Sequence, residues 1–358
     1  MWELDELSVP VLLGYVRALP PDPLLTGVNF LPNREIDDID FEYTVAAQKQ
    51  VIMAGLQGFD AEAQIVGQQA AGQLVRGSLP PIKIKTVINE KAIIKYTTPR
   101  VGTRDQAFAL DKVYGQVDDL VAGVQQRVEW LRIQALSQPL LTYNEGGRMM
   151  QFDYEFNKHF QFDLPTQKDA AGTDLSASLG PVWSDFTNST PISDLLFMSQ
   201  TMQETGFPPA TIVMSNKAKT YLLRSKSIIL EIRGKDSLAT RVTSTELAGL
   251  LTEYELPAIE TYDALVNREN ADGTITSLRP LDDSRAILLP SISVGETIWG
   301  PTAESRRALI MSGISEMQSG VFVNTAATDD PVAEWIKAAA LALPVIPQAH
   351  LVGQVELF

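Results

Sequence analysis

The densest group of residues that could do chemistry is an acidic run at residues 35–42. It holds five acids and no base, namely Glu35, Asp37, Asp38, Asp40 and Glu42. Carboxylates at this density could bind a divalent cation or form an acid–base pair. From residue 39 to 45 apolar and polar residues alternate, which predicts a half-buried strand. On that strand Asp38, Asp40 and Glu42 would share one face, with about 6.5–7 Å between neighbours. This spacing favours a solvated or partner-facing stripe over a catalytic pair.

A basic limb follows the acidic run. Residues 76–100 contain one acid and six bases, namely Arg76, Lys83, Lys85, Lys91, Lys95 and Arg100. Within it, residues 82–88 alternate Ile or Val with polar residues and predict a returning strand. The lysines alternate with Ile rather than with exposed aromatics, which favours an acidic protein neighbour over nucleic acid. We therefore predict that Arg76, Lys83, Lys85 and the five acids lie at contacts between subunits.

Other chemistry is poorly supported by the sequence. The chain has no Cys, which excludes disulfides, thiol nucleophiles and iron–sulfur clusters, and its two His are His159 and His350. Phosphate-binding glycine loops, the dinucleotide fingerprint, the serine-hydrolase elbow and the zinc-protease motif are all missing from the sequence. We predict no metal, no cofactor and no enzymatic activity.

Length and charge set the general class. The 358 residues suffice for two or three domains, and the 45% apolar content is that of a globular protein. The formal net charge of −15 argues against a surface that grips nucleic acid broadly. The acidic N-terminus lacks a secretory pattern, and prolines interrupt the uncharged stretch at residues 338–355. We expect a soluble protein that needs no oxidising compartment and no membrane.

Periodicity predicts the principal elements. A long helix is expected at about 111–137, because apolar residues recur every three or four positions, at Val113, Val117, Leu120, Val121, Val124, Val128, Leu131 and Ala135. Further helices are predicted at 191–205, 215–223 and 243–254, with a final helix starting at Asp330 and Pro331. Strands are predicted at 211–214, 259–267, 275–278, 287–289 and 297–299. Helices and strands mix without βαβ regularity, so the fold class is α+β.

The order of these features resembles a known family. The stretches that carry the resemblance are residues 113–146 with the long helix, residues 191–223, and the short motifs at 270–274, 299–302, 330–331 and 343–345. Together they resemble the major capsid proteins of tailed bacteriophages, specifically the lambda-like major capsid protein E family with the Hong Kong 97-type fold. The resemblance covers most of the chain and lies in the order and spacing of the motifs.

The resemblance implies both an architecture and a function. Residues 1–30 would be an N-terminal arm and 31–90 an extended loop lying over a neighbour. Residues 91–179 and 326–358 would form a peripheral domain around a spine helix, and 180–325 an axial domain. Subunits would assemble in the host cytoplasm into hexamers and pentamers that close an icosahedral shell around packaged double-stranded DNA. A scaffolding function, a portal and a decoration protein would be the further partners of the virion capsid.

Other functions remain open at this point. An encapsulin-like nanocompartment shell shares the fold but encloses cargo enzymes. A soluble carboxylate-using hydrolase would need convergent acids, whereas the sequence offers a strand-face stripe. A tail-tube subunit fits less well, because tube proteins are mainly β and this chain has a long helix.

Overall fold

The computed structural model describes residues 9–20, 22–45, 73–89, 104–145, 148–204, 206–235, 238–270, 272–312, 320–329 and 332–358. Residues 46–72 of the expected extended loop, and the basic residues Lys91, Lys95 and Arg100, lie outside these ranges.

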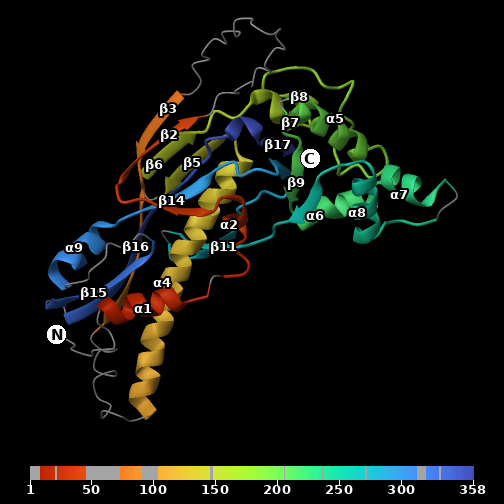
Figure 1. Cartoon of the computed structure of the whole chain (residues 1–358). Coiled ribbons are helices and arrows are strands. Elements are labelled where there is room, and N and C mark those ends of the chain that lie inside the picture. Colours follow the sequence, from red (N-terminus) through yellow and green to blue (C-terminus); the bar gives the residue numbers. More distant parts are fainter. Residues whose placement is uncertain are drawn as a thin grey trace, which may run out of the picture.

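The spine helix α4, at Arg104–Ser137, is the longest helix among the described residues. Its 34 residues correspond to about 51 Å at 1.5 Å per residue, and it begins seven residues before the predicted start. Figure 1 shows it as a rod that extends well beyond the sheet it packs against. All eight apolar residues predicted to form its stripe are buried, at 5% exposure or less. The predicted helix is therefore confirmed, together with the face it buries.

A five-stranded sheet lies against the spine helix. Its central strand is β16, which pairs antiparallel with β14, β15 and β4, while β1 extends the sheet by pairing parallel with β14. The bounds of these strands are β1 Asn33–Glu35, β4 Pro81–Asn89, β14 Glu296–Gly300, β15 Phe322–Asp329 and β16 Val332–Val345. The predicted strands at 82–88 and 297–299 are confirmed. Helix α9, Ala303–Ser312, connects β14 toward β15.

The helix predicted from Asp330 onward is wrong, because β16 is a 14-residue strand. Its alanines favour a helix when isolated. In the sheet, however, Ala338, Ala340 and Ala342 are fully buried in the same apolar cluster as the valines of α4. Small side chains let a helix and a sheet approach closely, so packing decides the conformation here and local propensity does not. Asp330 and Pro331 themselves lie outside the described residues.

Two antiparallel ribbons and two short helices surround this sheet. The ribbons pair β2 with β3 and β5 with β6, and the helices belong to the predicted N-terminal arm. Their bounds are β2 Asp40–Val45, β3 Gln73–Ser78, β5 Leu140–Glu145, β6 Arg148–Asp153, α1 Val9–Ala18 and α2 Gly27–Phe30. The alternation at 39–45 thus forms a strand as predicted. Helix α1 packs onto the spine helix, since its Leu12 is fully buried in the cluster that contains the spine valines.

A six-stranded sheet builds the second part of the molecule, on the right in Figure 1. Its strand order is β10-β9-β13-β17-β7-β8, and helices α5 to α8 share one apolar cluster with it. The strands are β7 Gln161–Asp163, β8 Lys168–Asp169, β9 Pro209–Met214, β10 Ala258–Thr261, β13 Arg285–Pro290 and β17 Gly353–Glu356. The helices are α5 Pro191–Gln203, α6 Asn216–Arg224, α7 Lys226–Arg233 and α8 Ser244–Glu253. The short 3₁₀ turns Lys158–Phe160 and Ala349–Leu351 precede β7 and β17.

Local sequence signals explain this second part well. Ser215 caps α6 by accepting from Ala218 N, and Thr243 with Glu246 forms a capping box at the start of α8. Gly206 follows α5 with a positive φ of 87°, as expected of a glycine after a helix end. The strand predicted over 259–267 is two strands, β10 and β11 (Val266–Glu269), and β11 pairs with β12 (Ile275–Leu278).

The two sheets confirm the α+β class, and each is built from separate stretches of the chain. Strand β14, at residues 296–300, belongs to the five-stranded sheet, and strand β17, at residues 353–356, belongs to the six-stranded sheet. No described helix has the length and apolarity needed to cross a bilayer.

The close packing of β16 under the spine helix gives a direct test. Replacing Ala340 by Leu should destabilise the protein by about 1–3 kcal/mol, because the added methylenes have no space beside the spine valines. The free energy of unfolding from urea titration measures this. Ala326 of β15 is exposed, so Ala326→Leu is the matched control and should change stability by less than about 0.5 kcal/mol. Equal effects of the two substitutions would contradict the packing described here.

Candidate assembly interface

The five acids of the acidic run lie on an exposed stretch that leads from one sheet to the next ribbon. Glu35 ends β1, Asp37 and Asp38 lie in the bend that follows, and Asp40 and Glu42 belong to β2. All five side chains are exposed. A hydrogen bond to the backbone fixes this bend: the Asp37 carbonyl oxygen accepts from Arg306 Nη2 at 3.0 Å. Asp38 precedes the strand, so the predicted stripe contains Asp40 and Glu42 without it.

The structure gives two of the predicted basic residues partners in the same chain. Arg76 lies directly opposite Glu42 in the β2–β3 ribbon, and its Nε is 3.0 Å from Glu42 Oε2. Lys83 Nζ is 2.9 Å from Oε1 of Glu304 on α9. Both pairs are partly exposed, and such pairs contribute at most about 1 kcal/mol. They reduce the charge that is left for another subunit.

Lys85 is placed differently from Lys83. Its ammonium lies 4.0 Å from the centroid of the Trp335 ring, which is a cation–π contact. Among the described residues, Lys85 and the carboxylates of Asp37, Asp38 and Asp40 have no partner in an ion pair. These four groups are the part of the predicted interface that no described residue neutralises through an ion pair.

Glu304 is a charged centre that the sequence did not reveal. It accepts hydrogen bonds from Lys83 and Lys337, which project from neighbouring strands. Burial acts to raise the pKa of this carboxyl, but the two ammonium groups outweigh burial and lower it to about 2. Lys83 and Glu304 are 221 positions apart, and nothing in the local sequence links them.

A buried polar network ties the spine helix to the segment before the acidic run. Glu129 is fully buried, and its Oε1 accepts from Gly27 N at 2.7 Å and from the Tyr262 hydroxyl at 3.0 Å. Its Oε2 lies 3.3 Å from Nη1 of Arg132, which is 6% exposed. Burial lowers the pKa of Arg132, and the adjacent Glu129 opposes that shift.

Arg132 continues the network into the sheet. Its Nε donates to Thr297 Oγ1 of β14 at 2.8 Å, and Nη2 donates to the Asn33 side chain of β1. Asn33 Oδ1 also accepts from Trp299 Nε1 at 2.9 Å. The buried guanidinium thereby fixes β1 and β14 against the spine helix. A charged i,i+3 pair beside an apolar stripe is the sequence signal that could have revealed this network.

A second charged contact joins the β5–β6 and β11–β12 strand pairs to the spine helix. Glu145 of β5 receives Arg127 of α4 at 2.8 Å and Arg268 of β11 at 3.1 Å. Burial acts to raise the pKa of Glu145, but hydrogen bonds from the two arginines lower it overall. Three elements far apart in sequence therefore meet at one carboxylate.

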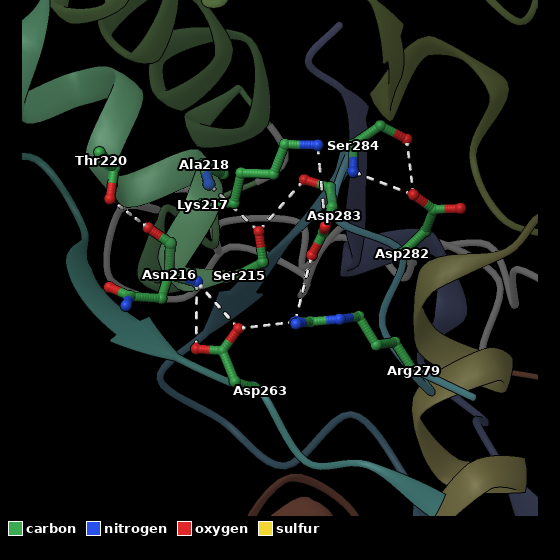
Figure 2. A network of polar contacts seen from close by, with 10 residues as sticks. All are labelled: Ser215, Asn216, Lys217, Ala218, Thr220, Asp263, Arg279, Asp282, Asp283 and Ser284. Atoms are coloured by element: carbon green, nitrogen blue, oxygen red, sulfur yellow. Dashed lines mark hydrogen bonds and ion pairs between the residues drawn. The ribbon is translucent and has the colours of Figure 1, made fainter. Parts of the chain in front are cut away.

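The polar cluster in Figure 2 organises the six-stranded part where β9, β10 and β13 approach the start of α6. Asp263 accepts from Asn216 N at 3.1 Å and pairs with Arg279, also at 3.1 Å. Lys217 and Arg279 both pair with Asp283, at 3.7 and 3.3 Å. These contacts cap a helix and brace loops, and every carboxylate has a structural partner, so the cluster stabilises the fold.

The described residues contain no group of three or more His, Asp or Glu positioned to hold a metal ion. His159 pairs with the buried carboxylate of Asp169 at 2.8 Å. His350 is partly buried, and burial lowers its imidazole pKa. A cavity of about 300 Å³ lies between α1 and the spine helix, lined among others by Leu13, Val128 and Arg132. Its walls are mixed, with apolar side chains beside the charged Arg17, Asp22 and Glu35.

Comparison with known proteins places these features in context. The sequence model of the family described as phage major capsid protein E matches residues 8–355. A prophage capsid protein of E. coli CFT073 has a similar structure, with a TM-score of 0.59 and 17% identity over 98% of this chain and 99% of that one. A phage-related protein of Bordetella bronchiseptica RB50 gives a TM-score of 0.55 and 12% identity, covering 98% and 97%. The search of curated proteins finds no match.

The lowered pKa of Glu304 predicts a specific pH dependence. A carboxyl whose folded pKa is about 2 stabilises the protein above its ordinary unfolded pKa of 4.5, and it loses that contribution as the pH falls toward 2. Glu304→Gln should therefore lower stability most above pH 4.5, and the difference from the unsubstituted protein should shrink toward pH 2. Thermal unfolding across this range measures it. Glu42→Gln, at an exposed pair, is the control and should cost less than about 1 kcal/mol. A difference for Glu304→Gln that does not change with pH would contradict this account.

The buried network predicts a non-additive pair of substitutions. Arg132→Met should destabilise the protein by about 3–5 kcal/mol, because it leaves the Glu129 carboxylate buried without a counter-charge. Adding Glu129→Gln removes that charge and keeps an acceptor for Gly27 and Tyr262. The double variant should therefore recover more than half of the loss, measured by urea unfolding. Losses that simply add would show that the two charges do not depend on each other.

Proposed function

The chain belongs to the phage major capsid protein E family, and we propose that its subunits form the hexamers and pentamers of an icosahedral shell around packaged double-stranded DNA. The family match over residues 8–355 is the observation that carries the proposal. The Hong Kong 97-type capsid fold predicted from the sequence is confirmed by likeness to the prophage capsid protein along nearly the full length of both chains. The chain is thus the major capsid protein of a phage virion.

The distribution of charge supports assembly through repeated contacts. Exposed carboxylates at Asp37, Asp38 and Asp40 lie on one stretch, and the exposed Lys85 lies on another. A contact between two different patches generates rings when the rotation closes. Opposite charges on the two patches would speed association and fix its register. We propose the full set of predicted interface residues in this role, with Glu42, Arg76 and Lys83 also engaged within the chain.

The role we propose is structural and not enzymatic. The polar clusters among the described residues are capping and bracing contacts with paired carboxylates. The net charge of −15 suits a container that holds DNA without gripping it. Scaffolding, portal and decoration proteins would be the partners of such a shell, and assembly would take place in the host cytoplasm. An encapsulin-like shell is the second candidate, and the family match favours the phage capsid.

Particle formation tests the proposed function. The purified chain, alone and with its phage's scaffolding function, should yield closed particles of uniform diameter in negative-stain electron microscopy, with a matching mass by light scattering. Particles from infected cells should contain phage DNA and a portal. A monomer or dimer under both conditions would overturn the shell, and particles filled with a protein cargo would favour the encapsulin-like reading.

A further inference from the structure

Strand β4 has one edge that no described strand pairs. Its nine residues, Pro81–Asn89, pair with β16 along one side. No strand in the described part of the chain pairs with the other side of β4. The opposite edge of this part of the sheet is β15, and helix α1 packs beside that strand. Within the described residues, this part of the sheet is therefore covered by α1 at its β15 edge and open at its β4 edge.

An open edge of this length is unusual in a finished structure. Nine residues exceed the usual strand length of about five or six, and an unpaired edge offers a row of N–H and C=O groups to any extended chain. Ile84 and Val87 on this strand are 41% and 44% exposed, although both are large apolar residues. Apolar exposure beside free backbone groups is the pattern of a strand that receives another strand.

The charge on β4 indicates which kind of strand it would accept. Lys85 is exposed, lies over the Trp335 ring, and forms no ion pair with a described residue. Lys83, two residues earlier, points its ammonium to Glu304. Carboxylates on an incoming strand would form ion pairs with Lys85, as Glu304 already does with Lys83. The chemistry of the edge thus favours an acidic, extended segment.

Strand β2 has the complementary properties. It carries Asp40 in the strand and Asp38 just before it, both exposed and without an ion-pair partner among the described residues. It pairs with β3 on one side, and in the described ranges no strand occupies its other side.

The chain's own β2 is held away from β4. All six residues of β2 are in register with β3, and Leu79 N donates to Ile39 O where the ribbon ends. Strand β4 begins two residues later and continues from β3 in the sequence. The β2 strand that could pair with the open edge therefore has to come from another copy of the chain.

We propose that the open edge of β4 receives the acidic strand β2 of a neighbouring copy, bringing Asp38 and Asp40 against Lys85. This inference rests on the proposed shell, because it names the contact through which one subunit joins the next. Backbone hydrogen bonds between the strands supply affinity, and the charges set the register. Since β2 and β4 are different patches of one chain, the contact is head-to-tail and can close a ring.

Charge exchange tests the contact. Lys85→Glu and Asp40→Lys should each raise the protein concentration needed for assembly by about tenfold, because each places like charges together. The double variant restores opposite charges and should return assembly to within about threefold of the unsubstituted protein. Lys158→Glu is the matched control, since Lys158 is an exposed lysine of the six-stranded part, and it should assemble normally. Thermal unfolding of every variant confirms folding, and Lys85→Gln shows what loss of the lysine charge and its Trp335 contact does without placing like charges together.

Disulfide trapping tests the geometry independently of stability. Because the chain has no cysteine, the variant with both Lys85→Cys and Asp40→Cys can form disulfides only between the introduced residues. Oxidised particles should give a ladder of covalent oligomers on non-reducing gels, and the pair Lys158→Cys with Asp40→Cys should give none.

The outcomes separate this contact from the shell itself. Particles that form normally from Lys85→Glu, or that give no ladder with the introduced cysteines, would overturn the strand contact and leave the shell standing. A product that stays at the monomer mass but migrates as a closed loop would place β2 against β4 of the same chain, which also overturns it. If the unsubstituted protein forms no particles, the proposed shell itself is overturned, and the strand contact with it.

Discussion

The buried pair of Glu129 and Arg132 is the interaction on which the arrangement of this protein depends. A guanidinium that is 6% exposed is tolerated only when its donors are satisfied, and here they reach Glu129, Thr297 and Asn33. These partners belong to the spine helix, β14 and β1, so the three elements cannot separate without leaving a charge unpaired in the interior. Glu129 in turn holds the backbone of Gly27. The acidic run starts where β1 ends, and its position therefore follows from this network.

The sequence predicted those elements whose signals are local. The apolar stripe of the spine helix, the caps at Ser215 and Thr243 and the alternation in β2 and β4 all depend on neighbours within a few residues. Strand β16 was mistaken for a helix because its alanines carry a local preference that the sheet overrides. Its conformation is decided by strands that enter from residues 81–89, 296–300 and 322–329, and a single window of sequence contains none of them.

The candidate interface was predictable in composition and not in pairing. The acidic run and the basic limb could be read directly from the sequence, and the structure places both on exposed strands and bends. That Arg76 faces Glu42 follows only from the register of β2 and β3, across an intervening segment of 27 residues that lies outside the described ranges. The partner of Lys83 is 221 positions away. Charge pairs formed by tertiary packing leave no spacing signature, whereas helix caps and strand alternation do.

The charge pairs that the fold forms internally also decide which charges remain for assembly. Once Glu42 pairs with Arg76, and Glu304 pairs with Lys83 and Lys337, the acidic run and the basic limb no longer act as two uniformly charged patches. Among their described residues, Asp37, Asp38 and Asp40 on one stretch, and Lys85 on a strand edge that no described strand pairs, have no ion-pair partner. A small number of unmatched charges beside free backbone groups gives a contact a defined register, because a shift by one residue would turn the charged side chains to the opposite face. The internal pairs would thus make the proposed interface more specific, because they remove charges that could also pair in a shifted register.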